Sequence, residues 1–101
     1  MSLKGRTALI TGSTSTGMGR STALRLAYEG ANIVLNYGTH REYGNHVGGT
    51  DANARAEEVA KHVRELGGEA IIVEADTRSE DDTIRMVNEA KKAFGTIDIL
   101  V

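Results

Sequence analysis

The sequence contains no cysteine and no proline. Without cysteine there can be no disulfide framework, no thiolate metal site and no cysteine nucleophile. Neither sign of charge dominates, because the formal net charge is -2 and acidic and basic residues are interspersed without a basic block. A nucleic-acid partner is therefore not expected.

Long hydrophobic runs are also missing. Residues 1–10 include one short apolar stretch, which lacks the core of a signal peptide and is too short to span a bilayer. Together with the absence of cysteine, this pattern favours a cytoplasmic protein that does not contact a membrane. The 101 residues, 40% hydrophobic and 26% charged, suffice for one small globular domain.

The hydrophobic residues that are present gather in short runs. These runs are nearly continuous, rich in β-branched residues and free of strict alternation, as in parallel strands buried on both faces. They cover residues 7–10, 32–37, 70–73 and 97–101. The sequence therefore predicts buried strands of a parallel sheet.

Helical periodicity separates the runs. Glycine follows each periodic segment, where a left-handed residue can end a helix. Ser79, followed three residues later by Asp82, resembles a capping box with Asp in place of the usual Glu. The residues expected to share buried helical faces are Ala23, Leu26 and Ala27, then Ala56, Val59, Ala60 and Val63, then Ile84, Val87, Ala90 and Phe94.

Strands alternating with helices predict an α/β protein with a parallel sheet and crossover helices. One segment breaks this rhythm. Residues 38–51 are polar, contain four glycines and exceed the ~2–6 residues usual between a strand and a helix. We expect a long loop there, either a functional lid or a disordered excursion.

A glycine-rich turn joins the first strand to the first helix. Its glycines have distinct uses: Gly12 permits a tight turn, Gly17 permits backbone amides to approach a pyrophosphate, and Gly19 permits close helix–strand packing. The helix N-terminus adds free N–H groups and partial positive charge. The turn is predicted to bind a dinucleotide through Gly12, Ser13, Thr14, Ser15, Thr16, Gly17, Met18 and Gly19.

Two other interpretations use the same turn. Four residues separate Gly12 from Gly17, as in the phosphate loop of nucleoside triphosphatases, but Met18 and Gly19 stand where that loop needs Lys and then Ser or Thr. The second interpretation is a glycine-rich turn without a ligand. The strand-to-helix context favours the dinucleotide.

Several signatures in order resemble the short-chain dehydrogenase/reductases. Residues 11–19 are similar to that family's TGxxxGxG turn, with one extra residue between the first two glycines. Ala75-Asp76 resembles the end of its third strand, and residues 94–101 resemble the run that precedes its NNAG motif. The resemblance covers the chain outside residues 38–51. It implies a three-layer, doubly wound Rossmann fold, of which residues 1–101 form the N-terminal part of a single domain.

The resemblance also implies an activity: hydride transfer between NAD(P) and a small carbonyl or alcohol substrate, in a dimer or tetramer. The family's catalytic Ser, Tyr and Lys would lie beyond Val101, so no catalytic residue is predicted here. A truncated nucleotide-binding module without catalysis is the alternative. In either case the fourth strand would be an apolar edge beside a partly covered face, and we expect a longer chain to cover both.

The end of the second strand decides between NAD and NADP. In NAD-preferring Rossmann proteins an acidic residue there binds the ribose hydroxyls. By register with the family, this position is Tyr37 in the present chain, so no carboxylate is available. NADP is therefore preferred, with NAD possible. Arg41 could pair with the 2′-phosphate, and Arg20 is a second candidate.

Other polar residues divide into site and structure. The resemblance places Asp76, with Thr77, on the adenine side of the cofactor. Asp98 interrupts an apolar strand and is predicted to be structural, which requires hydrogen-bond donors. The spacing of His40, His46 and Asp51 matches no metal site, and none is predicted.

Overall fold

The structure is a computed structural model that describes residues 3–11, 18–38 and 50–101. Strands and helices alternate from the first element to the last, as the sequence predicts. In chain order they are β1 (Thr7–Ile10), α1 (Met18–Tyr28), β2 (Asn32–Tyr37), α2 (Thr50–Glu65), β3 (Ala70–Glu74), α3 (Glu80–Phe94) and β4 (Ile99–Leu100).

All strand pairs are parallel, and the sheet order is β3-β2-β1-β4. The chain builds outward from β1 to β3 and then returns to the far side of β1. This order confirms the doubly wound prediction. The register pairs Leu9 with Val34 and with Leu100, and it pairs Tyr37 with Glu74 at the carboxyl end of β2.

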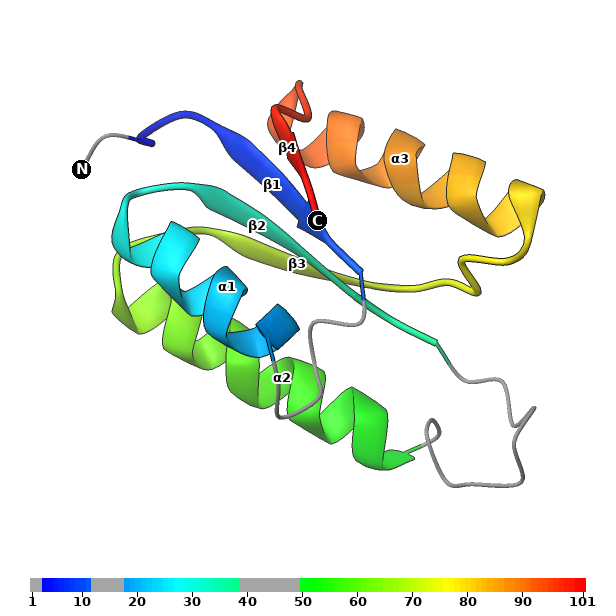
Figure 1. Cartoon of the computed structure of the whole chain (residues 1–101), viewed down its shortest axis with the longest axis horizontal. Helices are drawn as coiled ribbons and strands as arrows, with labels where there is room; N and C mark the ends of the chain where they lie inside the picture. Colours follow the sequence, from blue (N-terminus) through cyan, green and yellow to red (C-terminus); the bar gives the residue numbers. More distant parts are fainter. Residues whose placement is uncertain (1–2, 12–17, 39–49) are drawn as a thin grey trace.

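The layers follow from this order. Figure 1 shows α1 and α2 on one face of the sheet and α3 on the other. Residues of β1 alternate between the two sides: Ala8 and Ile10 lie in the core with α1 and α2, whereas Leu9 lies in the core with α3. Alternate residues of β1 therefore supply both cores, which is why Ala8, Leu9 and Ile10 are consecutive apolar residues.

The predicted helical faces are confirmed on one side of the sheet and partly wrong on the other. Ala56, Val59, Ala60 and Val63 are all fully buried. On α3 the buried residues are Met86 and Ala90, and Val87 and Phe94 pack against them. Ile84 was expected in this stripe but is 52% exposed, because Met86 occupies the position that faces Val34 and Val73.

Three segment boundaries differ from the predictions, one of them by a single residue, since β3 ends at Glu74. The last strand covers only Ile99–Leu100. Asp98 precedes it, and its side chain accepts a hydrogen bond from the Thr7 N–H at the start of β1. The predicted loop over 38–51 ends earlier, since α2 begins at Thr50. Residues 39–49 lie outside the described part of the chain.

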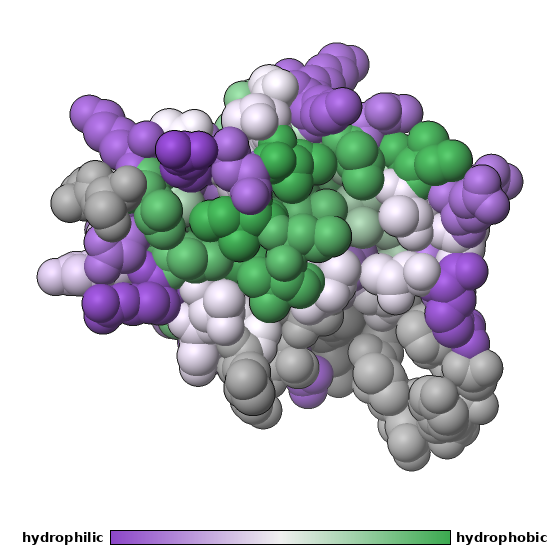
Figure 2. Space-filling view, turned by 45° about the horizontal axis from the view of Figure 1, so that its top comes forward, coloured by the Kyte–Doolittle hydropathy of each residue, from purple (hydrophilic) through white to green (hydrophobic). Residues whose placement is uncertain are grey.

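The face that carries α3 and β4 exposes hydrophobic side chains, as predicted. Figure 2 shows a broad hydrophobic surface over this part of the molecule. Ile84, Leu100 and Val101 are among the exposed large hydrophobic residues. No helix in the described ranges is long and apolar enough to cross a bilayer.

Candidate functional site

The carboxyl ends of the parallel strands form one edge of the sheet, and α1 begins on the same side (Figure 1). The order β3-β2-β1-β4 reverses direction between β1 and β4, with α1 and α3 on opposite faces. Ligands of open α/β sheets bind outside the carboxyl ends at such a reversal. Thr11 connects the two strands at this reversal, because its N–H and hydroxyl donate to the Val101 carbonyl at 3.1 and 3.0 Å.

The glycine-rich turn occupies this edge in the sequence, between β1 and α1. Gly12, Gly17 and the four hydroxyl residues between them lie outside the described residues. The structure begins α1 at Met18, with Gly19 half-buried in the first turn. The helix N-terminus required by the prediction is therefore present, and the contacts of the turn itself stay a prediction.

Tyr37 ends β2 at this edge. Its hydroxyl donates to Oδ1 of Asn53 in α2 at 3.3 Å. Burial raises the pKa of Tyr37 above its usual 10.0, and the negative charges of Glu74 and Glu57 raise that pKa further. The position that distinguishes ribose hydroxyls from a 2′-phosphate thus carries a neutral phenol in a negative local field.

Asn36 is a residue of this edge that the sequence analysis missed. Its side chain is buried, and its Nδ2 donates to the carbonyls of Val73 and Ala75, both at 3.2 Å. The backbone continues the link, because the N–H of Ala75 donates to the Tyr37 carbonyl at 3.0 Å. A buried amide thus ties the ends of β2 and β3 together. The interruption of the apolar run 33–35 by Asn was the available signal.

Asp76 lies two residues after the end of β3 and opens a tight turn. The Ser79 N–H donates to the Asp76 carbonyl at 2.9 Å, which closes the turn around Thr77 and Arg78. The Asp76 carboxylate accepts from the Arg78 backbone N–H at 2.9 Å and from the Arg78 guanidinium through Nε and Nη2, both at 3.2 Å. The structure therefore places Asp76 and Thr77 at the same edge as Tyr37, with Arg78 bound to the Asp76 carboxylate.

The predicted capping box at the start of α3 is half confirmed. The Ser79 hydroxyl accepts from the Asp82 N–H at 3.2 Å, as an N-cap should. The Asp82 side chain does not return to the Ser79 N–H, because that group already serves the turn. It accepts instead from the Asp76 N–H at 2.9 Å. The cap of α3 thereby fixes the backbone of Asp76.

Arg20, the second candidate for a 2′-phosphate partner, is engaged with α2. Its Nη2 lies 3.2 Å from Oε1 of Glu58 and 3.5 Å from Nδ1 of His62. The guanidinium therefore joins α1 to α2. Arg41, the first candidate, lies outside the described residues.

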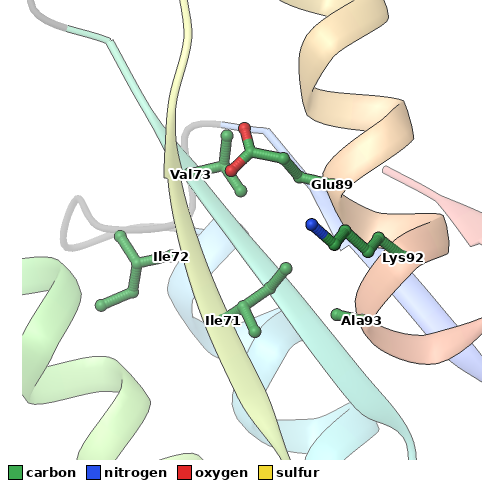
Figure 3. Close-up of a pocket in the computed structure, with 6 residues that line it drawn as sticks. All are labelled: Ile71, Ile72, Val73, Glu89, Lys92 and Ala93. Carbon is green, nitrogen blue, oxygen red and sulfur yellow. The ribbon is translucent and has the colours of Figure 1, made fainter.

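A separate hollow of about 460 Å³ lies between β3 and α3. Figure 3 shows Ile71 and Val73 on the side of β3 that faces α3, whereas Ile72 points to the opposite face. Glu89 at its rim already pairs with Arg85 at 2.8 Å. Its lining is otherwise apolar, with Glu89 and Lys92 as the charged residues, so the candidate site remains the carboxyl edge of the sheet. Within the described ranges no cluster of three or more metal-ligating side chains occurs.

The fold defines a doubly wound α/β protein of the Rossmann type. Residues 6–101 match the family model described as short chain dehydrogenase. The chain belongs to this family, as the resemblance of its sequence signatures predicted.

Named relatives agree with this assignment. A short chain dehydrogenase/reductase of Aspergillus aculeatus, AacuN, is 36% identical over 98 residues, which cover 97% of this chain and 32% of the relative. The 3-oxoacyl-[acyl-carrier-protein] reductase FabG of Staphylococcus epidermidis is 33% identical over 96 residues, 95% of this chain and 34% of the relative. The chain thus spans about a third of the length of these relatives.

Solved structures resemble the fold over almost the whole chain. A short chain dehydrogenase from Burkholderia cenocepacia in complex with NADP aligns with a TM-score of 0.82 and 31% identity, covering 99% of this chain and 36% of that one. A putative dehydrogenase from the same species with bound NADP gives a TM-score of 0.82 and 30% identity, covering 98% of this chain and 34% of that one. A short-chain dehydrogenase/reductase mutant from Serratia marcescens gives 0.81 and 31%, covering 99% and 36%.

Proposed function

We propose that the protein is an NAD(P)-dependent oxidoreductase of the short-chain dehydrogenase/reductase type. It would transfer a hydride between the nicotinamide and the carbon of a small carbonyl or alcohol substrate. The carrying observation is that a chain of this family brings the first turn of α1, Tyr37 and Asp76 to one edge of the sheet, at the reversal of strand order. Relatives named as reductases and dehydrogenases favour the enzyme over a non-catalytic module.

The residues of this chain would hold the cofactor, which supplies the hydride chemistry when bound. The turn of residues 12–17 and the backbone N–H groups in the first turn of α1, which begins at Met18, would bind the pyrophosphate. Tyr37 would lie against the adenosine ribose, and Asp76 with Thr77 against the adenine.

NADP is the preferred cofactor in this proposal. Tyr37 supplies no carboxylate to repel a 2′-phosphate, and Arg41 would pair with that phosphate. The NADP complexes of the two Burkholderia cenocepacia dehydrogenases support the preference. Glu57 and Glu74 oppose it, since both place negative charge near Tyr37.

Cofactor titration of the full-length protein tests the proposal. Nicotinamide fluorescence should reveal binding of NADPH and NADH, with NADPH tighter. A Gly17→Val change should abolish binding by placing a side chain against the pyrophosphate, and Gly17→Ala should weaken it less. Failure of wild type to bind either nucleotide, or full affinity in Gly17→Val, would reject this placement.

A matched pair of substitutions tests the cofactor preference. Tyr37→Asp should shift selectivity toward NADH, because the carboxylate would accept from the ribose hydroxyls and repel the phosphate. Tyr37→Asn introduces a side chain of nearly the same size as Asp but without its charge, and it should not produce this shift. Tighter NADH binding by wild type would overturn the preference. We further propose that the protein is cytoplasmic. We also propose that it assembles as a dimer or tetramer, and sedimentation of the full-length protein would measure this oligomeric state.

A further inference from the structure

The turn after β3 holds the Asp76 side chain more firmly than a surface carboxylate is usually held. Arg78 engages Oδ1 through its backbone N–H at 2.9 Å and through Nε at 3.2 Å, and it engages Oδ2 through Nη2 at 3.2 Å. The guanidinium thus makes the bidentate contact that fixes a carboxylate in its plane. Both oxygens of Asp76 are bonded by the residue two positions later.

The backbone beneath this pair is fixed as well. The Asp76 N–H donates to Oδ2 of Asp82 at 2.9 Å, and the Asp76 carbonyl accepts from the Ser79 N–H at 2.9 Å. Ser79 and Asp82 belong to the N-terminal cap of α3. The backbone position of Asp76 is therefore fixed from both ends of the turn. The remaining freedom is rotation of the Asp76 side chain, and Arg78 restricts that rotation.

We propose that Arg78 is a positioning residue for cofactor recognition, which holds the Asp76 carboxylate in the orientation that accepts the exocyclic amine of adenine. This inference rests on the proposed function. The exocyclic amine of adenine is an N–H₂ donor. An ionised carboxylate only accepts hydrogen bonds, so the two groups are complementary. Arg78 would act only through its hydrogen bonds to Asp76 and would not contact the base itself.

The pair remains accessible to a ligand. The Asp76 side chain remains 29% exposed and the Arg78 side chain 49% exposed. A carboxylate that is already oriented loses less rotational freedom when it binds, which is the general benefit of preorganisation.

The experiment compares two cofactors that differ at the base. Full-length protein is titrated with NADPH or NADH, whichever binds tighter, and with the reduced analogue in which hypoxanthine replaces adenine. The analogue has a carbonyl where adenine has the amine. Wild type should favour adenine by about tenfold or more, as expected when a hydrogen bond to a charged group is lost.

Variants of the pair then separate positioning from stability. Arg78→Met, which removes the guanidinium at similar length, should reduce the adenine preference by about two- to tenfold, the range for immobilising one side chain. Arg78→Lys should fall between Met and wild type, since a lysine lacks the planar fork. Asp76→Ala should abolish the preference, and adding Arg78→Met to it should have no further effect on the ratio.

Arg25→Met is the matched control. Arg25 forms a comparable exposed ion pair, 3.3 Å from Glu29, at the C-terminal end of α1 and away from the carboxyl edge. It should keep the wild-type ratio. A purely structural role for Arg78 predicts equal losses for both cofactors, and that result overturns the inference.

The failures of the two proposals are distinguishable. If wild type binds neither nucleotide, the proposed function is wrong and this inference falls with it. If wild type binds and prefers adenine while Arg78→Met keeps the full preference, only the role of Arg78 is wrong. If wild type binds both bases equally, the carboxylate does not recognise the amine, and the inference is overturned while nucleotide binding stands.

Discussion

Asp98 and Thr7 bond each other twice across the start of β1 and β4. The Thr7 N–H donates to Oδ2 of Asp98 at 2.9 Å, and the Asp98 N–H donates to the Thr7 carbonyl at 2.9 Å. Arg6 lies 3.5 Å from the other carboxylate oxygen. The acidic residue that interrupts an apolar run is thus structural, as predicted, and it connects β4 to the centre of the sheet.

Asp98→Ala should lower the free energy of unfolding by about 1–3 kcal/mol, because it leaves the buried Thr7 N–H without its acceptor. Asp98→Asn keeps an acceptor oxygen and should cost less. Arg6→Ala is the control: its side chain is 62% exposed, and such pairs contribute less than about 1 kcal/mol. Urea denaturation of the full-length protein measures all three. An Arg6→Ala loss equal to that of Asp98→Ala would assign the effect to the ion pair.

Gly30 and Gly95 both have positive φ, +100° and +84°, but their surroundings differ. A Cβ at Gly95 would meet no atom within 4 Å, whereas one at Gly30 would lie 3.2 Å from the backbone N and Cα of Lys4. Gly95→Ala should therefore cost only the left-handed strain, about 1–2 kcal/mol. Gly30→Ala should cost more, because the Leu3 N–H bonds the Glu29 carbonyl at 2.9 Å and holds the neighbouring segment.

Thermal unfolding of the two variants checks this order. Equal losses would mean that the segment around Lys4 moves aside without cost. A larger loss at Gly95 would contradict the steric argument altogether.

The fold could be predicted from the sequence because the short apolar runs identify the buried strands. A parallel strand buried on both faces is mostly apolar, and β1 and β2 have the predicted bounds, although each also buries one polar residue, Thr7 in β1 and Asn36 in β2. Ile84 shows the limit of periodicity: it shares a stripe with Ala90, yet the sheet beneath α3 contacts Met86 instead. Which of two neighbouring stripes is buried depends on the rotation of the helix, and that is set by tertiary packing.

The site was predictable only as far as its residues lie in recognisable positions. Tyr37 and Asp76 follow from the ends of strands, and the structure brings both to one edge. Arg78 and Asn36 could not be assigned in advance, because their roles depend on side-chain contacts formed after the strands pair. A basic residue in a turn and an amide in a strand have many possible partners until the register is known.

Arg20 should not determine the choice between NADP and NAD. Its guanidinium is bonded to Glu58 at 3.2 Å, so it is not oriented toward a ligand. Arg20→Met should leave the ratio of NADPH to NADH affinities within about twofold of wild type, whereas loss of a phosphate-binding arginine should cost tenfold or more, as for a hydrogen bond to a charged group.

Glu58→Gln provides the complementary test. It weakens the hold on Arg20 without removing the cation. A rise in NADPH affinity in this variant, together with a fall in Arg20→Met, would show that Arg20 binds the 2′-phosphate after all. Unchanged ratios in both variants would confirm that Arg20 does not bind the 2′-phosphate.

Tyr37 links the electrostatics of the site to pH. Its pKa is raised above 10.0, first by burial and then by the charges of Glu74 and Glu57. The folded state therefore favours the neutral phenol more than the unfolded state does. The stability that results is fully present below pH 10.0 and is lost as the pH rises through the raised pKa of the folded protein.

Glu74→Gln should lower the Tyr37 pKa toward 10.0 without reaching it, because burial, the largest cause, remains. Glu57→Gln should lower it less. The carbon-13 shift of the labelled phenol ring reports the titration, with Tyr28 and Tyr43 replaced by Phe. Glu69→Gln, which removes a carboxylate just before the opposite end of β3, is the control and should leave the titration unchanged. The charge that disfavours a phenolate also disfavours a phosphate, so Glu74→Gln should raise the NADPH-to-NADH affinity ratio. A lower pKa with an unchanged ratio would place the 2′-phosphate away from Tyr37.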